Sequence, residues 1–325
     1  MMADKPRFIR RKRFKRKSER KLSQADLFVL DFLWTWKVAS TPILKEIAFR
    51  SKSQWWTYKA LRQLQQERYI QALPRGRHIA FELWTLTELG FEVVLMDRDD
   101  ISQYRYRPHA PAHDYLATCL QLGDLWHATH LDVRTFSEQA LASLTPANFP
   151  RSFRKRDEHI PDGLTLIVNG GREALIGYEV DLNLKADERY DNTYSYYVHG
   201  PRPQLIVWLV KSQWVATKII EALQKRHRGE ELNQFLASIA FVGLDDFKAR
   251  IWEAQCICGT LRGHTISKLH ANLIQSLGKS APKSRQKELR ELFFPRFKSP
   301  QKLTSYTESE VAAATKHPTG VGNIN

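Results

Sequence analysis

The chain has 325 residues, of which 42% are hydrophobic and 26% are charged, and it carries a formal net charge of +15 at pH 7. This composition is that of a globular protein with enough residues for two domains. Its excess of positive charge indicates a polyanionic partner, either nucleic acid or an acidic membrane surface. Three cysteines are too few for a disulfide framework, so we expect a cytoplasmic protein. No apolar run approaches the ~18 residues of a transmembrane helix, which excludes membrane insertion.

The positive charge is concentrated at the two ends of the chain. Residues 1–107 carry 23 basic and 12 acidic side chains, a net +11, whereas residues 108–278 carry 18 and 19, a net −1. Residues 279–325 carry 9 basic and 4 acidic side chains, a net +5. This distribution favours a near-neutral body with extensions that bind nucleic acid.

The first of these extensions is very basic. From Lys5 to Lys21, 11 of 17 residues are Lys or Arg, and such a stretch repels itself. We predict a disordered arm over residues 1–22 that lies along DNA phosphates, and a basic flexible tail over residues 279–325. The alternative is that both are solvated ends without a partner. The arm residues that we expect to contact DNA include Arg11, Arg13 and Lys15.

Three helices are predicted at the start of a first folded domain, residues 23–100. Ser23 followed by Asp26 has the spacing of a capping box and opens a helix that ends near Lys37. Thr41-Pro42 starts a second helix, with the threonine as N-cap and the proline at the first helical position. A third helix is predicted over residues 53–66.

A hairpin and a last helix complete this domain. The extended runs 69–73 and 79–84 flank a turn that contains glycine and two arginines, which predicts a hairpin, and residues 87–96 form the last helix. Three helices followed by a basic hairpin resemble the winged helix-turn-helix of many bacterial DNA-binding proteins. In that geometry the third helix enters the major groove of double-stranded DNA, and the hairpin tip reaches phosphates or the minor groove. The predicted contacts are Ser51, Lys52, Ser53, Gln54, Tyr58 and Lys59 on the helix and Arg75 and Arg77 at the tip, whereas Trp55 and Trp56 are expected in core and interface packing.

The second domain, residues 108–278, has the element order of an α/β protein with a mixed sheet. A helix opens at His113-Asp114 and a strand covers residues 131–135. Two further strands, 160–168 and 174–182, are joined by an Asn-Gly-Gly turn. There follow a polar helix over 185–197, a buried central strand over 205–210 and a helix over 214–225. The segments 232–242 and 251–259 are apolar, and their pattern does not decide between helix and strand.

Acidic residues on the two hairpin strands carry the candidate chemistry. The Pro-Asp at Asp162 and the Glu-x-Asp at Glu179 and Asp181 resemble the PD-(D/E)xK nuclease core. That core places one acid at the start of a strand and a second on its hairpin partner, where both bind Mg²⁺ or Mn²⁺ for phosphodiester cleavage. Asp181 stands where the motif has lysine, so Lys185 on the following helix is the candidate cation.

A structural interpretation of the same residues stays open. Asp162 could lie in a turn after Pro161, with Glu179 and Asp181 on a solvated strand face, because Tyr178, Val180 and Leu182 would share the buried face. His113 and Asp114 could likewise serve only as capping residues at a helix start.

The winged helix, the His-Asp pair, the Pro-Asp-Gly and the Glu-Val-Asp together resemble the replication-relaxation family of mobile elements and the MobC-type plasmid mobilisation relaxases. The resemblance covers roughly residues 23–225. It implies a relaxase-like endonuclease that recognises and nicks an origin, with Asp114 as a further metal ligand and His113 as a phosphate or water contact. Other relaxosome or transfer proteins and a second copy of the chain, in a homodimer, are candidate partners, but the sequence alone does not decide between them. The alternative is a non-catalytic regulator or relaxosome accessory factor that binds DNA without cutting it.

Overall fold

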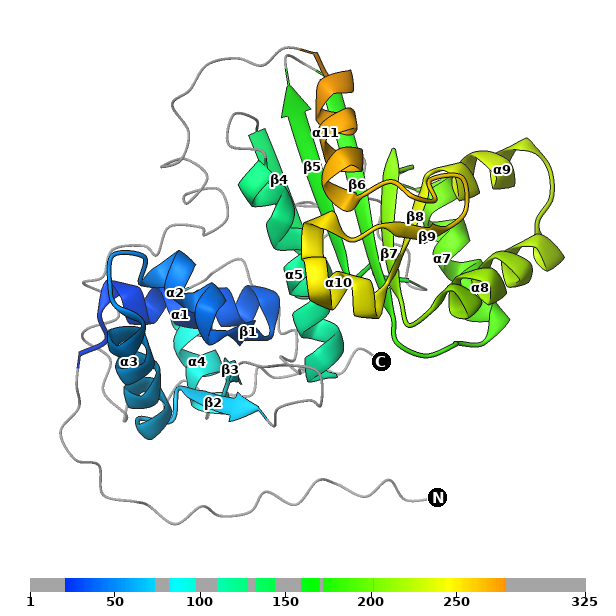
Figure 1. Ribbon diagram of the computed structural model, residues 1–325. Coiled ribbons are helices and arrows are strands. Elements are labelled where there is room, and N and C mark those ends of the chain that lie inside the picture. Colours follow the sequence, from blue (N-terminus) through cyan, green and yellow to red (C-terminus); the bar gives the residue numbers. More distant parts are fainter. Residues whose placement is uncertain are drawn as a thin grey trace, which may run out of the picture.

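The computed structural model describes residues 21–73, 82–97, 110–127, 132–143, 159–169, 172–200 and 202–278. The protein is of the α/β class (Figure 1). The first part of the chain forms helices and a small antiparallel sheet, which we call the N-terminal unit. The part that follows forms a six-stranded mixed sheet with helices on both faces, which we call the sheet unit. Within these ranges no helix combines the length and the apolar character needed to cross a bilayer.

The N-terminal unit is built around α1 (Gln24–Trp36), which is buried nearly all round. The predicted capping box is confirmed, since the Ser23 N–H donates to the Asp26 carboxylate at 2.8 Å and the Asp26 N–H donates to the Ser23 hydroxyl at 3.2 Å. α2 (Thr41–Ala48) begins one residue earlier than predicted, because the N-cap with extended backbone is Ser40. The Thr41 hydroxyl instead accepts a hydrogen bond from the Trp84 indole at 2.8 Å.

A small antiparallel sheet covers one side of these helices. Its strands β1 (Ala39–Ser40), β3 (Leu83–Leu86) and β2 (Ile70–Leu73) lie in the order β1-β3-β2. α3 (Gln54–Gln66) precedes this hairpin and α4 (Glu88–Asp97) follows it, as predicted. The second hairpin strand extends further along the chain than expected, because Ile70 pairs with Leu86. The predicted turn between the strands lies outside the described residues.

The large sheet has the strand order β4-β5-β6-β7-β8-β9. The first three strands are antiparallel, β6, β7 and β8 are parallel, and β9 runs antiparallel to β8. All six residues of β7 are apolar and buried, which confirms the predicted central strand. The strand bounds are β4 Asp132–Ser137, β5 Gly163–Asn169, β6 Arg172–Asp181, β7 Leu205–Val210, β8 Ile239–Gly243 and β9 Cys256–Cys258.

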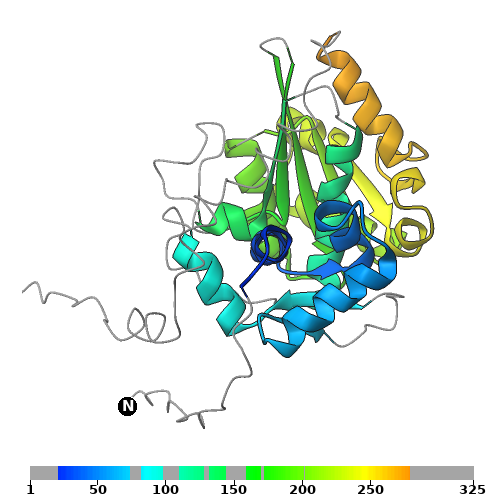
Figure 2. The same ribbon diagram turned by 90° about the vertical axis from the view of Figure 1, so that its left-hand side faces the viewer.

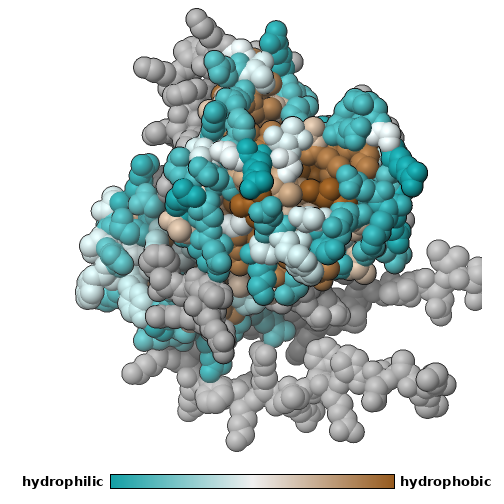
Figure 3. All heavy atoms as spheres, turned by 45° about the vertical axis from the view of Figure 1, so that its right-hand side comes forward, coloured by the Kyte–Doolittle hydropathy of each residue, from teal (hydrophilic) through white to brown (hydrophobic). Residues whose placement is uncertain are grey.

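Helices cover both faces of the large sheet (Figure 1 and Figure 2). On one face pack α5 (Pro111–His127), α10 (Leu244–Arg250) and α11 (Ile266–Ser276), against β6 residues such as Tyr178 and Val180. On the other face pack α7 (Asp187–His199), α8 (Gln213–Arg226) and α9 (Glu230–Ala237). The short α6 (Glu138–Ser143) follows β4, and a 3₁₀ turn (Ile251–Glu253) precedes β9. On the side drawn in Figure 3, hydrophobic atoms show mainly in hollows between hydrophilic side chains.

The two units share α5. Leu116 and Leu120 belong to the core under the large sheet, whereas Leu122 packs into the core of the N-terminal unit. The Thr118 hydroxyl donates to its own helix at Asp114 O, 2.8 Å away, and lies 3.3 Å from the carbonyl oxygen of Trp36. The end of α1 is therefore anchored directly on the helix that begins the sheet unit.

Candidate functional site

Asp162 lies where the chain enters β5, and the strand register places it beside the end of β6. Gly163 pairs with Tyr178, and the Val180 N–H donates to Asp162 Oδ2 at 2.7 Å. The Gln121 amide donates to the Asp162 carbonyl oxygen at 2.7 Å. A Cβ at position 163 would lie 2.1 Å from Cδ of Gln121, so this approach of α5 requires the glycine after Asp162.

Glu179 is buried on β6, with only 4% of its surface exposed. His159 Nε2 lies 2.8 Å from Glu179 Oε1, and the Tyr197 hydroxyl donates to the same oxygen at 2.8 Å. The ring of Tyr197 approaches the backbone so closely that a Cβ at Gly177 would lie 2.7 Å from its hydroxyl oxygen. The carboxylate is thus held by a histidine and by the helix that covers this face.

Asp181 follows on the same face and is 2% exposed. The Trp208 indole donates to its Oδ2 at 3.0 Å, and Lys185 Nζ lies 2.5 Å from its Oδ1. Lys185 precedes α7 rather than lying on it, because that helix begins at Asp187. The interpretation of Glu179 and Asp181 as a solvated strand face is therefore wrong, since α7 and α8 bury it.

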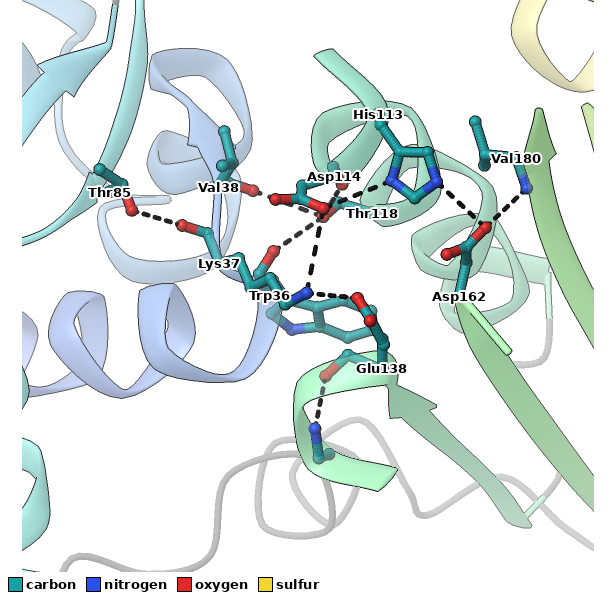
Figure 4. Close-up of polar contacts among 12 residues, drawn as sticks. Trp36, Lys37, Val38, Thr85, His113, Asp114, Thr118, Glu138, Asp162 and Val180 are labelled. Atoms are coloured by element: carbon teal, nitrogen blue, oxygen red, sulfur yellow. Dashed lines mark hydrogen bonds and ion pairs between the residues drawn. The ribbon is translucent and has the colours of Figure 1, made fainter. Parts of the chain in front are cut away.

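A chain of charged contacts connects Asp162 with the N-terminal unit, as Figure 4 shows. His113 Nε2 lies 3.3 Å from Asp162 Oδ2, and its Nδ1 lies 3.4 Å from Asp114 Oδ1. Asp114 Oδ1 is in turn 4.0 Å from the ammonium of Lys37, which forms an ion pair with Glu138. The structure thus brings Asp162, Glu179, Asp181 and Lys185 together and directs Asp114 toward Lys37.

A small cleft lies between α1, α5 and α6 along this chain of contacts. Most of the residues that line it are polar, and Asp162 is one of them. The lining includes Lys37, His113, Asp114, Gln121, Glu138 and Gln139.

The pKa values in the site reflect burial and pairing. Burial lowers the pKa of His113, but the charge of Asp162 and the hydrogen bonds to Asp162 and Asp114 outweigh it and raise the pKa to about 10. Burial raises the pKa of Asp162, yet His113 and Lys185 more than reverse this and lower it. Burial lowers the pKa of His159, but the charge of Glu179, the hydrogen bond to Glu179 and the charge of Asp162 together outweigh it and raise the pKa. His113 is therefore cationic at neutral pH, and His159 holds its proton more strongly than a free imidazole does.

Glu179 differs from Asp162 in its pKa. Burial raises the pKa of Glu179, and this exceeds the lowering effect of His159. The nearby charge of Asp162 acts in the same direction as burial. The two carboxyl groups therefore interact, and Glu179 holds a proton more readily than Asp162.

The oxygens of these two acids fit a hard cation. The contacts described above use Asp162 Oδ2 and Glu179 Oε1, and they leave Asp162 Oδ1 and Glu179 Oε2 unused. Mg²⁺ is commonly bound by one or two carboxylates together with water and substrate phosphate. In the described ranges, no three His, Cys, Asp or Glu side chains are grouped so that they could hold a metal by themselves. The residues present thus fit a cation bound by two carboxylates.

The predicted DNA-contacting helix presents an exposed face. On α3 and just before it, Lys52, Ser53, Gln54, Tyr58 and Lys59 are all exposed. Ser53 is the N-cap and accepts a hydrogen bond from the Trp56 N–H at 3.2 Å. The expectation of core packing is wrong for Trp55, whose ring lies outside the core, whereas Trp56 contacts Phe49 with ring centroids 5.4 Å apart. The other predicted contacts, Arg11, Arg13, Lys15, Arg75 and Arg77, lie outside the described residues.

Sequence reasoning did not single out His159, Trp208, Lys37 or Glu138 as residues of the site. The position of His159, two residues before the Pro-Asp pair, was a usable signal for a residue near the acids. Lys37 and Glu138 are 101 positions apart in the chain, and neither belongs to a motif. Only their tertiary placement reveals them.

No protein-family model matches the chain, and neither a curated protein nor a solved structure is detectably similar to it.

Proposed function

We propose that this chain is a DNA-binding protein of a mobile element that nicks DNA at an origin, using a divalent metal at Asp162 and Glu179. The observation that carries the proposal is the convergence of these two carboxylates at one end of the β5–β6 pair, with Lys185 beside them. Carboxylate oxygens are the ligands that Mg²⁺ and Mn²⁺ prefer.

The arrangement of elements supports the same function. From α5 to β7 the order is helix, strand β4, the short helix α6, the antiparallel strands β5 and β6, helix α7 and the parallel strand β7. One acid stands at the start of β5 and the other on its hairpin partner, as in the PD-(D/E)xK core. The three helices and the β2–β3 hairpin of the N-terminal unit support a winged helix that binds double-stranded DNA.

Each residue of the site has a role in this proposal. When bound, Mg²⁺ or Mn²⁺ would lower the pKa of a water and stabilise negative charge on the attacked phosphate. Asp162 and Glu179 would hold the ion, and His159 and Tyr197 keep Glu179 in place through its Oε1. Lys185 is partly exposed and contributes positive charge where a phosphate approaches, while Asp181 holds its ammonium.

A second candidate function is that of a DNA-binding accessory factor without cleavage. Asp181 occupies the position of the motif lysine, and it is buried and bonded to Trp208 and Lys185. Each acid is also compensated by a cation of the chain itself, as expected of a structural ion-pair cluster. Tight DNA binding without nicking would favour this function.

The test is a nicking assay on supercoiled plasmid that carries the DNA flanking the gene, with Mg²⁺, Mn²⁺ or EDTA. We expect metal-dependent conversion to open circles by the full chain, and a loss of about 100-fold or more in Asp162→Asn and Glu179→Gln. Glu173→Gln is the matched control, because Glu173 lies exposed at the other end of β6. Normal folding and DNA binding by the two inactive variants would exclude a structural cause. Absence of nicking with every metal, despite tight binding, would refute cleavage by the chain alone.

A further inference from the structure

The buried residues on the inner face of α3 are sufficient to pack this helix on the core, and the aromatic residues near its start are not needed for that packing. Thr57, Leu61 and Leu64 are buried and recur at the spacing of one helix face. Trp55 lies outside this face with 68% of its surface exposed. An aromatic side chain this exposed is unusual, since tryptophan is highly buried on average. Folding of the helix therefore does not require the ring of Trp55.

Positive charge accompanies each exposed ring on this helix. Lys59 Nζ lies 5.3 Å from the ring centroid of Trp55, and Lys52 Nζ lies 5.4 Å from that of Trp56. The Arg62 guanidinium lies 4.9 Å from the ring of Tyr58. The sequence from Gln54 to Gln66 contains no aspartate or glutamate. The face thus combines flat aromatic surfaces with cations and suits a polyanion that also offers aromatic faces.

Two of the three rings are held in place by their neighbours. Arg62 Nε donates to the Tyr58 hydroxyl at 2.9 Å, and the same guanidinium forms an ion pair with Glu82 at 2.9 Å. Trp56 rests by an edge on Phe49. A ring that is already fixed loses little conformational entropy on binding, so Tyr58 and Trp56 are suited to support a base that is stacked on Trp55.

The proposed ligand of this face is unpaired nucleic acid. Trp55 carries a single N–H donor, so it is poorly suited to reading the paired donors and acceptors of base edges in a groove. Its flat face matches a base that is not stacked on a neighbour, and the adjacent lysines match the phosphates of the same strand. We propose that the exposed face of α3 stacks unpaired bases of single-stranded DNA, with Trp55 as the main platform. This rests on the proposed function, in which the same helix binds double-stranded DNA, and it adds unpaired DNA as a second form that the helix holds.

The experiment measures fluorescence anisotropy of a labelled 20-mer of thymidine and of a blunt duplex of equal length, titrated with the full chain. We expect Trp55→Ala to weaken single-strand binding roughly 5- to 150-fold, the range for loss of one base-stacking ring, and to change duplex binding much less. Trp55→Phe should restore single-strand affinity to within about threefold, because it keeps an aromatic face. The matched control is Trp214→Ala, since Trp214 is 59% exposed near the start of α8 in the sheet unit.

The outcomes separate this inference from the proposed function. The stacking proposal is overturned if Trp55→Ala leaves the single-strand affinity unchanged, or if it weakens the binding of both forms of DNA equally. An unchanged affinity would assign the ring to a protein partner. If Trp55→Ala loses single-strand binding and the wild type fails to nick DNA with any metal, the proposed cleavage is refuted and the stacking proposal stands. If the wild type nicks DNA but Trp55→Ala binds single strands as tightly as the wild type, the proposed cleavage stands and the stacking proposal is refuted.

Discussion

Lys37 is the residue whose replacement most directly tests how the two units are joined. Its side chain is buried at the end of α1, forms an ion pair with Glu138 and lies 4.0 Å from Asp114 Oδ1. Lys37→Met keeps most of the apolar length of the side chain and removes its charge, so that the carboxylates of Glu138 and Asp114 lose the ammonium between them. The backbone of residue 37 has a φ of 63°, but lysine and methionine bear this strain equally, so it cancels from the comparison.

The size of the effect follows from the burial of the partners. Removing one partner of a buried ion pair costs about 3–5 kcal/mol, because the other charge is left uncompensated. Glu138 retains 26% side-chain exposure and can be partly solvated, so we expect the lower end, about 3 kcal/mol of unfolding free energy.

The assay is urea unfolding followed by tryptophan fluorescence. In Lys37→Met/Glu138→Gln the second substitution removes the charge that the first left unpaired, so the two losses should fall short of additivity by about 1 kcal/mol or more. Lys218→Met is the control, because Lys218 pairs with Glu221 on the exposed side of α8, and it should cost less than about 1 kcal/mol. A loss below about 1 kcal/mol in Lys37→Met, or strict additivity in the double variant, would refute the reasoning.

Three further predictions concern single residues. The pKa of His113 is about 10 in the folded protein and about 6.5 in the unfolded chain, so its pairing with Asp162 stabilises the fold fully below pH 6.5 and loses this effect as the pH rises through 10. The urea midpoint should therefore fall more steeply between pH 7 and 10 in the wild type than in His113→Gln. Equal slopes in the two proteins would contradict this. Gly177→Ala should cost about 1–3 kcal/mol in urea unfolding, since its Cβ would lie 2.7 Å from the Tyr197 hydroxyl, and a neutral result would argue against that contact. Ser23→Ala should lower the unfolding free energy by about 1 kcal/mol through loss of the α1 cap, and Ser23→Asp should restore most of it.

The elements that the sequence predicted well are those with a strong local pattern. β7 has the predicted bounds, α1 begins after the serine that was expected to cap it, and α3 begins within one residue of the predicted start. β1 was missed because its two residues are ordered only by pairing with Leu83 and Trp84. The segment 232–242 was left open because one apolar run contains both α9 and β8.

The candidate site was predicted in its acids and in Lys185, but the burial of the acids was not. Asp162, Glu179 and Asp181 stand on two strands joined by a strong turn, so local reasoning already placed them at one end of a hairpin. Their burial was not predictable, because the polar alternation along β6 is the pattern of a solvated face. Lys185 was named as the candidate cation from its place four residues after Asp181, whereas His113 and His159 pair with acids far from them in the sequence.

The first turn of α5 explains why the two units belong to one structure. Successive residues of a helix point about 100° apart, so adjacent side chains reach different neighbours. His113 reaches Asp162 beside the large sheet, and Asp114 reaches toward Lys37 at the end of α1 (Figure 4). A shift of α1 relative to α5 must break the contact with Asp114 or move this turn, and a movement of the turn changes the contact that His113 makes with Asp162. The His-Asp pair is thus a junction between the N-terminal unit and the acid cluster, which neither helix capping nor metal binding alone would explain.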